Sequence, residues 1–471
     1  MFTSDLDTIA AVATPMGSGG IGIVRISGPK AVDISKQLFQ AAHRKSDRDP
    51  KAPKRALKSH VMYLGNIVDE EQKRVIDQVL MVIMYAPNSY TRENVVEIHC
   101  HGGPVILRAI LQLVFKCGAR SAAPGEFTKR AYINGRIDLS QAEAVADMIN
   151  AKTDLALNFA TDQLIGGLQK KANRIIEELK QIIACMEAGI NFPEDIDENE
   201  CNGKIAEQLK STCLDSLVSL AKSYDSGCLL RDGVNLAIVG RPNVGKSSLF
   251  NKLIDAEKAI VTPYPGTTRD TVEAVYSING IPFQFIDTAG LHDTNHPIER
   301  IGINRTRDVL SKAHLVLLVL EATQPFSAED TEILSRIENK KCICAINKID
   351  LVKERYVNER NEFWKDITII DTSAKTGYGI EKLKKSIADE CFRDPNYRTD
   401  STIVSNIRHK FAIEEAADKV RDAMDVISGY SNEELAIIDL NDAIKALERI
   451  LGKRIDTDVL DVIFNKFCIG K

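Results

Sequence analysis

The sequence predicts a multidomain fold of α/β and all-α parts: an α+β domain at the N-terminus, then a helical domain interrupted by an inserted α/β domain. Three observations support this fold class. Residues 1–121 mix short strand-like runs with helical ones. Amphipathic helical patterns fill residues 122–231 and return over 389–471. Between them, over 232–388, continuous apolar runs alternate with helical patterns, which is typical of buried parallel strands.

The composition limits the classes of function. The 471 residues can form about two to four domains, and 44% hydrophobic with 27% charged residues is ordinary for a globular protein. A formal net charge of −5 gives no general attraction to nucleic acid, so any contact with RNA must be local. No apolar run reaches the roughly 18 residues of a membrane span, and the ten scattered cysteines fit a reducing compartment. We therefore expect a cytoplasmic protein without membrane contact.

The N-terminal segment contains three runs that predict strands, over 8–14, 20–27 and 78–85. The glycines of "GSGGIG" (17–22) have the spacing of a dinucleotide-binding loop. Because a strand-like run comes next instead of a helix, we expect a glycine-rich hairpin or pocket loop there. The basic stretch 42–60 could touch phosphates, but its two prolines and its polarity favour a solvated connector.

Two long patterns predict helices over 139–164 and 170–190. Apolar residues recur at three- and four-residue spacing in the second and form one stripe, at Ile175, Leu179, Ile182, Ile183 and Met186. The five acids within 194–200 could bind a cation, but a solvated turn between helices is the simpler interpretation.

The stretch "VNLAIVGRPNVGKSSLF" (234–250) joins an apolar strand to a helix through the pattern G-x-x-x-x-G-K-S. This is the context of a phosphate-binding loop, in which glycines let backbone N–H groups wrap the phosphates. Lys246 would reach the β- and γ-phosphate oxygens, and Ser247 would ligate Mg²⁺. The nucleotide-binding residues predicted here are Asn243, Val244, Gly245, Lys246, Ser247 and Ser248.

Four further segments select the base and complete the phosphate contacts. Asp350 of "NKID" follows an apolar strand and can accept both the N1–H and the exocyclic amine of guanine, a pair that adenine lacks. "SAK" (373–375) supports the base, and "GTTRD" (266–270) and "DTAG" (287–290) reach Mg²⁺ and the γ-phosphate, with Thr268 as a second hydroxyl on Mg²⁺. The order of motifs resembles the translation-factor-related GTPases. The additional GTP-binding residues predicted from these motifs are Gly266, Thr267, Thr268, Asp287, Thr288, Ala289, Gly290, Asn347, Lys348, Asp350, Ser373, Ala374 and Lys375.

The catalytic residue of GTP hydrolysis is not the usual one. Many GTPases orient the attacking water with a glutamine after D-x-x-G, but here the residue is Leu291, which cannot. Another group must act. Asp293 and Glu299 are candidates in the same segment, and either could instead be a solvated acid.

Across essentially its whole length, the chain resembles the MnmE (TrmE) family of bacterial tRNA modification GTPases. The resemblance rests on "DTIAAVATP", "GGIGIVRISG", "ENVVEIHCHGGP", "APGEFTKRAYINGRIDLSQAEAV", "NFPEDID", the nucleotide motifs and the terminal "FCIGK". Many GTPases share the nucleotide motifs, whereas the N- and C-terminal motifs are specific to this family.

The resemblance implies a folate-binding N-terminal domain that also forms a homodimer, a helical domain split in sequence, and a GTPase domain inserted in it. It implies joint action with the FAD-binding protein MnmG (GidA), in a heterotetramer, on the wobble uridine of certain tRNAs. A C5 aminomethyl-type (carboxymethylaminomethyl) group is added there, with 5-formyl- or 5,10-methylene-tetrahydrofolate supplying the one-carbon unit. The implied cofactors are thus GTP, Mg²⁺, K⁺ and a tetrahydrofolate derivative.

The resemblance also implies roles for single residues. Glu299 matches the glutamate that orients water, which favours it over Asp293. A potassium ion beside the phosphates would act where an arginine finger acts in other GTPases. The matching potassium positions are Asn243, Thr262, Tyr264 and Thr267, and Thr262 is implied to contact GTP as well. The matching folate positions are Arg25, Glu97, Arg136 and Lys471.

Two positions depart from the family pattern. Arg136 stands where lysine is common, which keeps the charge but changes the geometry. His292 stands where arginine is usual, and we assign it no role.

The cysteine of the terminal "FCIGK" has several interpretations. As a prenylation signal "CIGK" is weak, because its last residue is lysine and glycine is not aliphatic. Cys468 could be a buried structural residue after the apolar "VIFNKF". The family match places the tail against the N-terminal domain, where the thiol could take part in the modification chemistry.

Two other functions compete with tRNA modification. A regulatory GTPase that binds ribosomes or other RNA without modifying it would share the nucleotide motifs, and a folate enzyme with a vestigial GTPase domain would not need them intact. Folate binding, by the 1–120 segment or by the full chain, distinguishes the regulatory GTPase from the modifying enzyme.

Overall fold

The structure, a computed structural model, describes residues 7–42, 57–191, 198–254, 275–286, 310, 312–337, 340–352, 367–391, 402–429, 433–453, 455 and 457–471. The chain forms two compact units, residues 1–146 with 451–471, and residues 147–450. The first unit therefore contains both the N-terminal segment and the C-terminal tail. The boundaries at 121, 231 and 388 stay a prediction.

A seven-stranded sheet is the framework of the first unit. Its strands are β1 (Ile9–Val12), β2 (Gly19–Ser27), β3 (Phe39–Ala41), β4 (Met62–Asp69), β5 (Arg74–Met84), β6 (Val95–Gly102) and β7 (Arg120–Ser121). Its helices are α1 (Ala31–Leu38), α2 (Pro104–Lys116), α3 (Glu126–Ile133), α16 (Thr457–Phe464) and the beginning of α4 (Leu139–Asn150). The strand order is β3-β4-β5-β6-β2-β1-β7, with every neighbouring pair antiparallel except β1 and β7.

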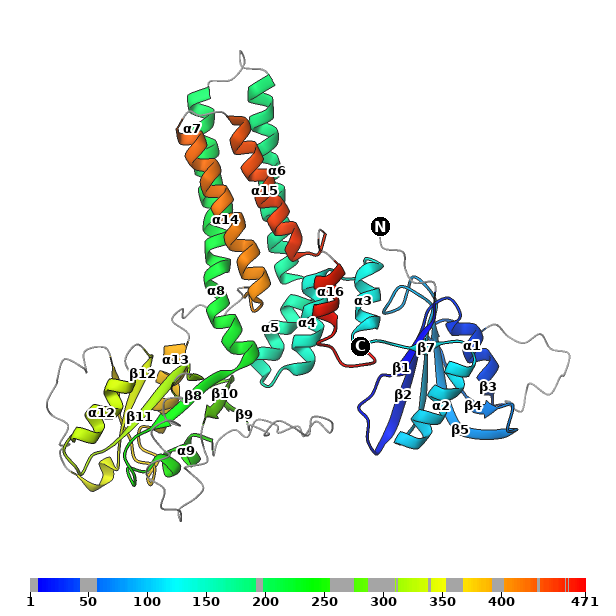
Figure 1. The fold of residues 1–471 in the computed structure, drawn as a ribbon, viewed down its shortest axis with the longest axis horizontal. Coiled ribbons are helices and arrows are strands. Elements are labelled where there is room, and N and C mark those ends of the chain that lie inside the picture. The colour runs from blue at the N-terminus through cyan, green and yellow to red at the C-terminus, as the bar shows by residue number, and fades with distance from the viewer. Residues whose placement is uncertain are drawn as a thin grey trace. The chain divides into compact units, whose positions relative to one another are not determined.

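The two faces of this sheet are covered differently. Helices α1 and α2 lie along one face (Figure 1) and bury a core in which Val24 and Ile98 pack with Ile110. On the other face, Phe127 of α3 packs with Ile9 at the β1 end. Large apolar side chains stay exposed on the strands β2, β4 and β5, at Ile21, Met62, Leu64 and Leu80.

An ion-pair network fixes α3 in the first unit. The Arg130 guanidinium is 8% exposed and lies 2.6 Å from Asp7 and 3.0 Å from Glu126. It also lies 3.1 Å from Glu93 Oε1, while Arg120 donates to both oxygens of Glu126. Burial alone would raise the pKa of Asp7 and Glu126, but the hydrogen bonds and charges of the two arginines outweigh it, so both pKa values are lowered. Three carboxylates thus share two guanidinium groups.

The α/β part of the second unit has a six-stranded sheet. Its strands are β8 (Val234–Val239), β9 (Val275–Ile278), β10 (Ile281–Ile286), β11 (Leu315–Glu321), β12 (Cys342–Asn347) and β13 (Thr368–Asp371). Its helices are α9 (Lys246–Ile254), α12 (Ala328–Ile337), the short 3₁₀ helix η3 (Ile349–Leu351) and α13 (Ile380–Cys391). The order is β13-β12-β11-β8-β10-β9, and only β9 and β10 pair antiparallel.

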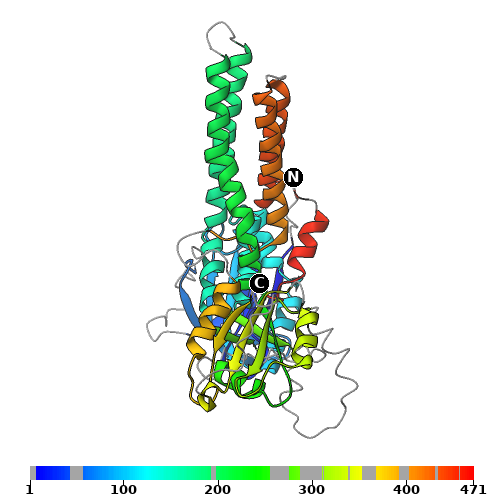
Figure 2. The ribbon, with the colours of Figure 1, turned by 90° about the vertical axis from the view of Figure 1, so that its left-hand side faces the viewer.

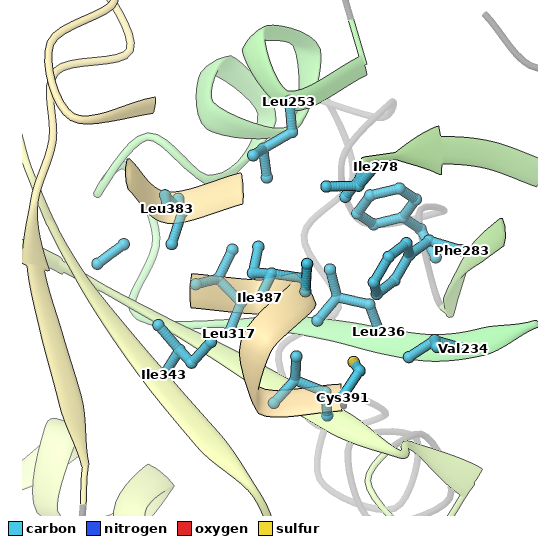
Figure 3. Close-up of a cluster of buried hydrophobic side chains, with 14 of the residues drawn as sticks. Val234, Leu236, Leu253, Ile278, Phe283, Leu317, Ile343, Leu383, Ile387 and Cys391 are labelled. Carbon is cyan, nitrogen blue, oxygen red and sulfur yellow. The ribbon is translucent and has the colours of Figure 1, made fainter. Parts of the chain in front are cut away.

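Helices cover both faces of this sheet, which explains why the sequences of its strands are continuous apolar runs. Every residue of β11 is buried. Leu317 belongs to a core with Leu253 of α9 and Leu383 of α13 (Figure 3), and the next residue, Leu318, packs in a second core with Leu334 of α12. A strand that is buried on both faces cannot alternate with polar residues.

The helical part of the second unit is a set of helices, the longest of which lie side by side (Figure 2). They are α5 (Asp154–Leu164), α6 (Gly167–Asn191), α7 (Glu198–Gln208), α8 (Asp215–Asp232), α14 (Ile407–Ser428) and α15 (Glu433–Ile450), with a π-helical segment η2 (Leu209–Leu214) between α7 and α8. The predicted apolar stripe of α6 is confirmed, since Ile175, Leu179, Ile182, Ile183 and Met186 are all buried. Helices from both sides of the inserted domain thus pack together.

Several sequence predictions can be compared with these elements. The hairpin expected at 17–22 is confirmed, because β2 begins at Gly19 and pairs antiparallel with β1. Strand β9 was missed, although the Asn279–Gly280 turn after it is a strong hairpin signal. Residues 43–56 of the basic stretch and 194–197 of the acidic run lie outside the described residues. No helix in the described part of the chain is both long and apolar enough to span a membrane.

The Arg130 network yields a stability prediction. Arg130→Met should lower the free energy of unfolding of the first unit by about 3–5 kcal/mol, because it leaves carboxylates without a buried partner. The control Lys116→Met removes a mostly exposed pair with Glu71, which solvent screens, and should change the stability little. Urea unfolding of the full chain measures both variants, and equal costs would contradict the role given to Arg130.

The same network has a pH dependence. Asp7 and Glu126 have lowered pKa values in the folded state, so their contribution to stability is present above the unfolded values and disappears as pH falls through the folded ones. Wild type should therefore lose stability in acid more steeply than Arg130→Met. Unfolding midpoints measured from neutral to strongly acidic pH test this difference.

Candidate functional sites

The predicted nucleotide site lies at the edge where the parallel strands β8 and β12 end. The phosphate loop, residues 240–247, follows β8, and "NKID" begins at the last residue of β12. "SAK" follows β13, which pairs with β12. Parallel strands bring their carboxyl ends to one edge, where ligands of such sheets bind. The structure therefore brings together three of the five predicted nucleotide segments.

The phosphate loop has a backbone that few residue types adopt. Gly240 and Gly245 have φ values of +151° and +96°, and the intervening Asn243 is left-handed at +64°. A Cβ on Gly245 would lie 2.3 Å from the Asn347 side chain. Positive-φ conformations of this kind allow successive N–H groups to face one concave surface, which suits a phosphate chain.

Lys246 is placed to meet an anion. Its ammonium group donates to the carbonyls of Gly240 and Arg241 at 2.8 and 2.7 Å. Burial lowers the pKa of this lysine, so a negative charge next to it would stabilise the protonated form. The oxygens of a triphosphate would provide that charge.

Asn347 connects all three segments of the site. It is 2% exposed, and its amide nitrogen donates to the Val244 carbonyl at 3.0 Å. Its side-chain oxygen accepts from the backbone N–H of Ala374, also at 3.0 Å. One buried side chain thus fixes the distance between the phosphate loop and the two loops expected to hold the base.

Lys348 continues this connection at the surface. Its ammonium donates to the Asn243 carbonyl at 2.9 Å and lies 3.0 Å from Glu321 Oε2. Burial would raise the pKa of Glu321, but hydrogen bonds from Thr323 and Lys348 outweigh it and hold the pKa below its usual value. Glu321 therefore stays charged and orients Lys348.

The carboxylate predicted to read the base is also oriented. Asp350 is exposed, and one of its oxygens accepts from the Ser373 hydroxyl at 2.6 Å. Ser373 is fully buried and its hydroxyl also accepts from the Thr376 N–H. Lys375 and Ser248 are exposed beside the site.

The remaining predicted nucleotide, potassium and catalytic residues lie outside the described residues. They are Thr262, Tyr264, Gly266, Thr267, Thr268, Asp287, Thr288, Ala289, Gly290 and Glu299. Of the predicted metal positions, the structure describes Ser247, which lies in the first turn of α9, and Asn243.

A second site lies in the first unit, around Arg25 of β2. Its Nε donates to Glu97 Oε1 at 2.8 Å, and Glu97 Oε2 is 3.4 Å from His99 Nε2. The guanidinium carbon lies 5.7 Å from the Phe127 ring centroid and 5.8 Å from that of Tyr90, within the range of cation–π attraction. Its side chain is 18% exposed, so it can still be reached from solvent.

The C-terminal tail closes against this second site. The Gly470 carbonyl accepts from Arg25 Nη1 at 3.3 Å, and the Lys471 carbonyl accepts from the Phe127 N–H at 3.2 Å. Gly470 has a φ of +96°, and a Cβ there would lie 2.2 Å from the Val12 carbonyl oxygen. The expected return of the tail to the N-terminal domain is therefore what the structure shows.

The other predicted residues of this site are close by. Arg136 is exposed, donates to the Tyr90 carbonyl at 2.8 Å and lies over the Tyr90 ring at 4.7 Å. Lys471 is half-buried. Cys468 is exposed, and its carbonyl accepts from the Gly125 N–H, so the thiol is not a core residue.

Comparisons with known proteins decide the family. Family models for the MnmE helical domain and for the GTP-binding protein TrmE N-terminus match residues 139–468 and 8–136. A tRNA modification GTPase MnmE of Acetivibrio thermocellus is 42% identical over 99% of each chain. The chain belongs to the MnmE family of tRNA modification GTPases. MnmE proteins of a Thermoanaerobacter species and of Geobacillus thermodenitrificans are 43% and 41% identical, and each comparison covers 99% or more of both chains.

Membership of the MnmE family confirms the resemblance predicted from the terminal motifs. The mixed sheets and the helical domain confirm the predicted fold class as well. Sequence reasoning missed the supporting residues of this MnmE chain, notably Glu321 behind Lys348 and the fully buried Asp330, which lies 3.0 Å from Arg241 of the phosphate loop. The only sequence signal for Glu321 is its position at the end of a buried strand.

The phosphate loop yields a prediction about Gly245. Gly245→Ala should weaken GTP binding by more than about tenfold, because the new Cβ would displace Asn347 from both of its partners. The control Gly118→Ala also has a positive φ, +101°, but meets nothing within 4 Å, so it tests backbone strain alone and should keep GTP affinity. Titration with a fluorescent GTP analogue measures both. Unchanged binding by Gly245→Ala would contradict the role of Asn347.

Proposed function

We propose that this chain hydrolyses GTP and, with an FAD-dependent partner, installs a C5 aminomethyl-type (carboxymethylaminomethyl) group on the wobble uridine of certain tRNAs, using a tetrahydrofolate one-carbon unit. The observation that carries the proposal is that one chain contains two separate sites. One is the sheet edge with the motifs expected to bind a guanine nucleotide, and the other is the Arg25 site that the C-terminal tail closes. A simple nucleotide switch does not need the second site. Relatives that match the full length are named tRNA modification GTPases.

In the proposed GTP site, each described residue has a chemical task. Lys246 compensates charge on the β- and γ-phosphates, and Asp350, oriented by Ser373, accepts from the two N–H groups of guanine. Ser247 and Thr268 supply hydroxyl ligands to Mg²⁺. The first of these hydroxyls lies at the start of α9, where a helix N-terminus also favours the phosphates.

We further propose that hydrolysis is stimulated by potassium. Asn243, Thr262, Tyr264 and Thr267 would hold the ion and Glu299 would orient the attacking water. A monovalent cation there offsets negative charge that develops between the phosphates. What supports Asn243 is its left-handed backbone in the phosphate loop and the fixing of its carbonyl by Lys348.

The second site has the chemistry of a folate site. A tetrahydrofolate derivative such as the 5-formyl or 5,10-methylene form carries carboxylates at one end and a pterin with N–H donors at the other. The Arg136 side chain suits the first, and the Glu97 carboxylate, to which Arg25 donates, suits the second. We assign folate binding to Arg25, Glu97, Arg136 and Lys471. The exposed Cys468 thiol, three residues before the C-terminus, is available for the modification chemistry.

The proposed partners follow from the surface and from the family. We propose a homodimer through the open sheet face of the first unit, where Leu64 pairs across the strands with Leu80 and both are at least 40% exposed. MnmG (GidA) would join this dimer in a heterotetramer that acts on tRNA in the cytoplasm.

A regulatory GTPase that binds ribosomes or other RNA is the alternative function. Such a protein would need the nucleotide site but not the Arg25 site. Binding of 5-formyltetrahydrofolate to the full chain, measured by calorimetry, separates the two functions, since the alternative predicts none.

The potassium proposal can be tested by turnover. GTP hydrolysis in potassium buffer should exceed that in sodium buffer by about tenfold or more, and Asn243→Ala should remove the difference. The control Asn235→Ala changes an asparagine at the opposite end of β8, where its side chain donates to the Lys312 carbonyl, and should keep the potassium response. Equal GTP turnover of the wild type in both salts would contradict the proposal.

The dimer proposal can be tested with charges. Leu64→Glu combined with Leu80→Glu should convert dimer to monomer, because each places a carboxylate in the apolar contact. The control Val105→Glu alters a residue that is 76% exposed on α2, whose helix covers the other sheet face, and should leave the dimer intact. Light scattering after size exclusion reports the mass of each variant. A double variant that stays dimeric means that the contact lies elsewhere.

A further inference from the structure

Tyr90 stands between the two arginines assigned to the folate site. Its ring centroid lies 5.8 Å from the guanidinium carbon of Arg25 and 4.7 Å from that of Arg136. Both distances are within the range in which a cation is attracted to the face of an aromatic ring. The Tyr90 ring therefore interacts with both guanidinium groups, although Arg25 and Arg136 come from different parts of the chain.

The Tyr90 ring is itself held in place. Its hydroxyl is 3.0 Å from the hydroxyl of Thr128, a fully buried residue of α3. The ring also packs against the cluster that contains Phe127 and Ile9. A polar and a hydrophobic contact to α3 thus orient it before any ligand is bound.

The loop that carries Tyr90 is fixed as well. The Ser89 hydroxyl donates to the Glu93 carbonyl at 2.6 Å, which closes the loop on itself. Asn134, at the end of α3, donates to the Thr91 carbonyl at 2.7 Å, and Arg92 donates to the Asn134 carbonyl at 3.0 Å. The loop cannot shift without breaking bonds to α3, so the ring is a fixed reference point.

Arg136 depends on Tyr90 more than Arg25 does. Arg25 has three additional partners, which are Glu97, the Gly470 carbonyl and the Phe127 ring. Arg136 is exposed, and in the described part of the chain its contacts are to the carbonyl and the ring of Tyr90. An exposed arginine samples many rotamers unless something restricts it, and ordering it on binding costs affinity.

We propose that Tyr90 is a positioning residue of the folate site, whose ring orders the Arg25 and Arg136 guanidinium groups before the ligand binds. The proposal rests on the folate assignment made above and adds a residue outside the four assigned. It also explains how arginine serves at position 136, because a planar guanidinium stacks on an aromatic face in a way that an ammonium group does not.

The test is folate affinity of the full-length protein, measured by calorimetry with 5-formyltetrahydrofolate. Tyr90→Leu and Tyr90→Met, which remove the ring, should each weaken binding about tenfold. Tyr90→Phe keeps the ring and should bind within about threefold of wild type, although it loses the hydrogen bond to Thr128. Tyr85→Leu is the matched control, since this tyrosine lies at the start of the same loop and donates to the Leu57 carbonyl instead, and should bind as wild type does.

A double-mutant cycle separates positioning from stability. If the ring acts by ordering Arg136, Tyr90→Leu should cost much less affinity in an Arg136→Gln background than in wild type. Thermal unfolding of each full-length variant, followed by circular dichroism, verifies that the first unit is folded. Wild-type folate affinity in both ring-removing variants would overturn the proposal. So would a double variant whose fold-loss of affinity equals the product of the losses in Tyr90→Leu and Arg136→Gln. Absence of folate binding by the wild type would instead overturn the folate assignment, and this proposal with it.

Discussion

The two hydrogen bonds of Asn347 are the constraint on which the nucleotide site depends. A buried amide must satisfy both its donor and its acceptor, and here the phosphate loop and the Ala374 loop do so at 3.0 Å each. Only a glycine at 245 leaves room for that side chain. The strained loop, the buried asparagine and the parallel sheet edge are therefore one arrangement, in which no part can change alone.

In the first unit, hydrogen bonds from distant parts of the chain likewise hold one side chain, Arg25. The Arg25 side chain is only 18% exposed, and the sheet alone gives it one polar partner, Glu97. The second polar partner is the carbonyl of Gly470, which reaches Arg25 only because the tail returns to β1 with a positive φ. The last residues of the chain thus complete a site that begins on the second strand. This is a physical reason for a glycine in the terminal "FCIGK".

Sequence patterns predicted the features that depend on local rules. Periodicity and spacing were enough for the buried strand β11, the stripe of α6 and the strand–loop–helix at Gly245. Strand β9 was missed because it is short and its signal lies in the turn after it. The return of the tail to Arg25 came from the family resemblance, since no pattern within 467–471 indicates a contact 445 residues away.

Residues that contact a ligand can be recognised in a sequence more easily than residues that orient those contacts. Lys348 belongs to a motif, because a ligand fixes its spacing from Asp350. Glu321 and Tyr90 act through another side chain, so their spacing is set by the fold and no motif contains them. Each nevertheless restricts a long cationic side chain that would otherwise lose rotamer entropy when the ligand binds. The supporting group costs little to keep ordered, since Glu321 ends a buried strand and Tyr90 sits in a loop bonded to α3. Both sites are therefore organised before binding by residues that only the three-dimensional structure identifies.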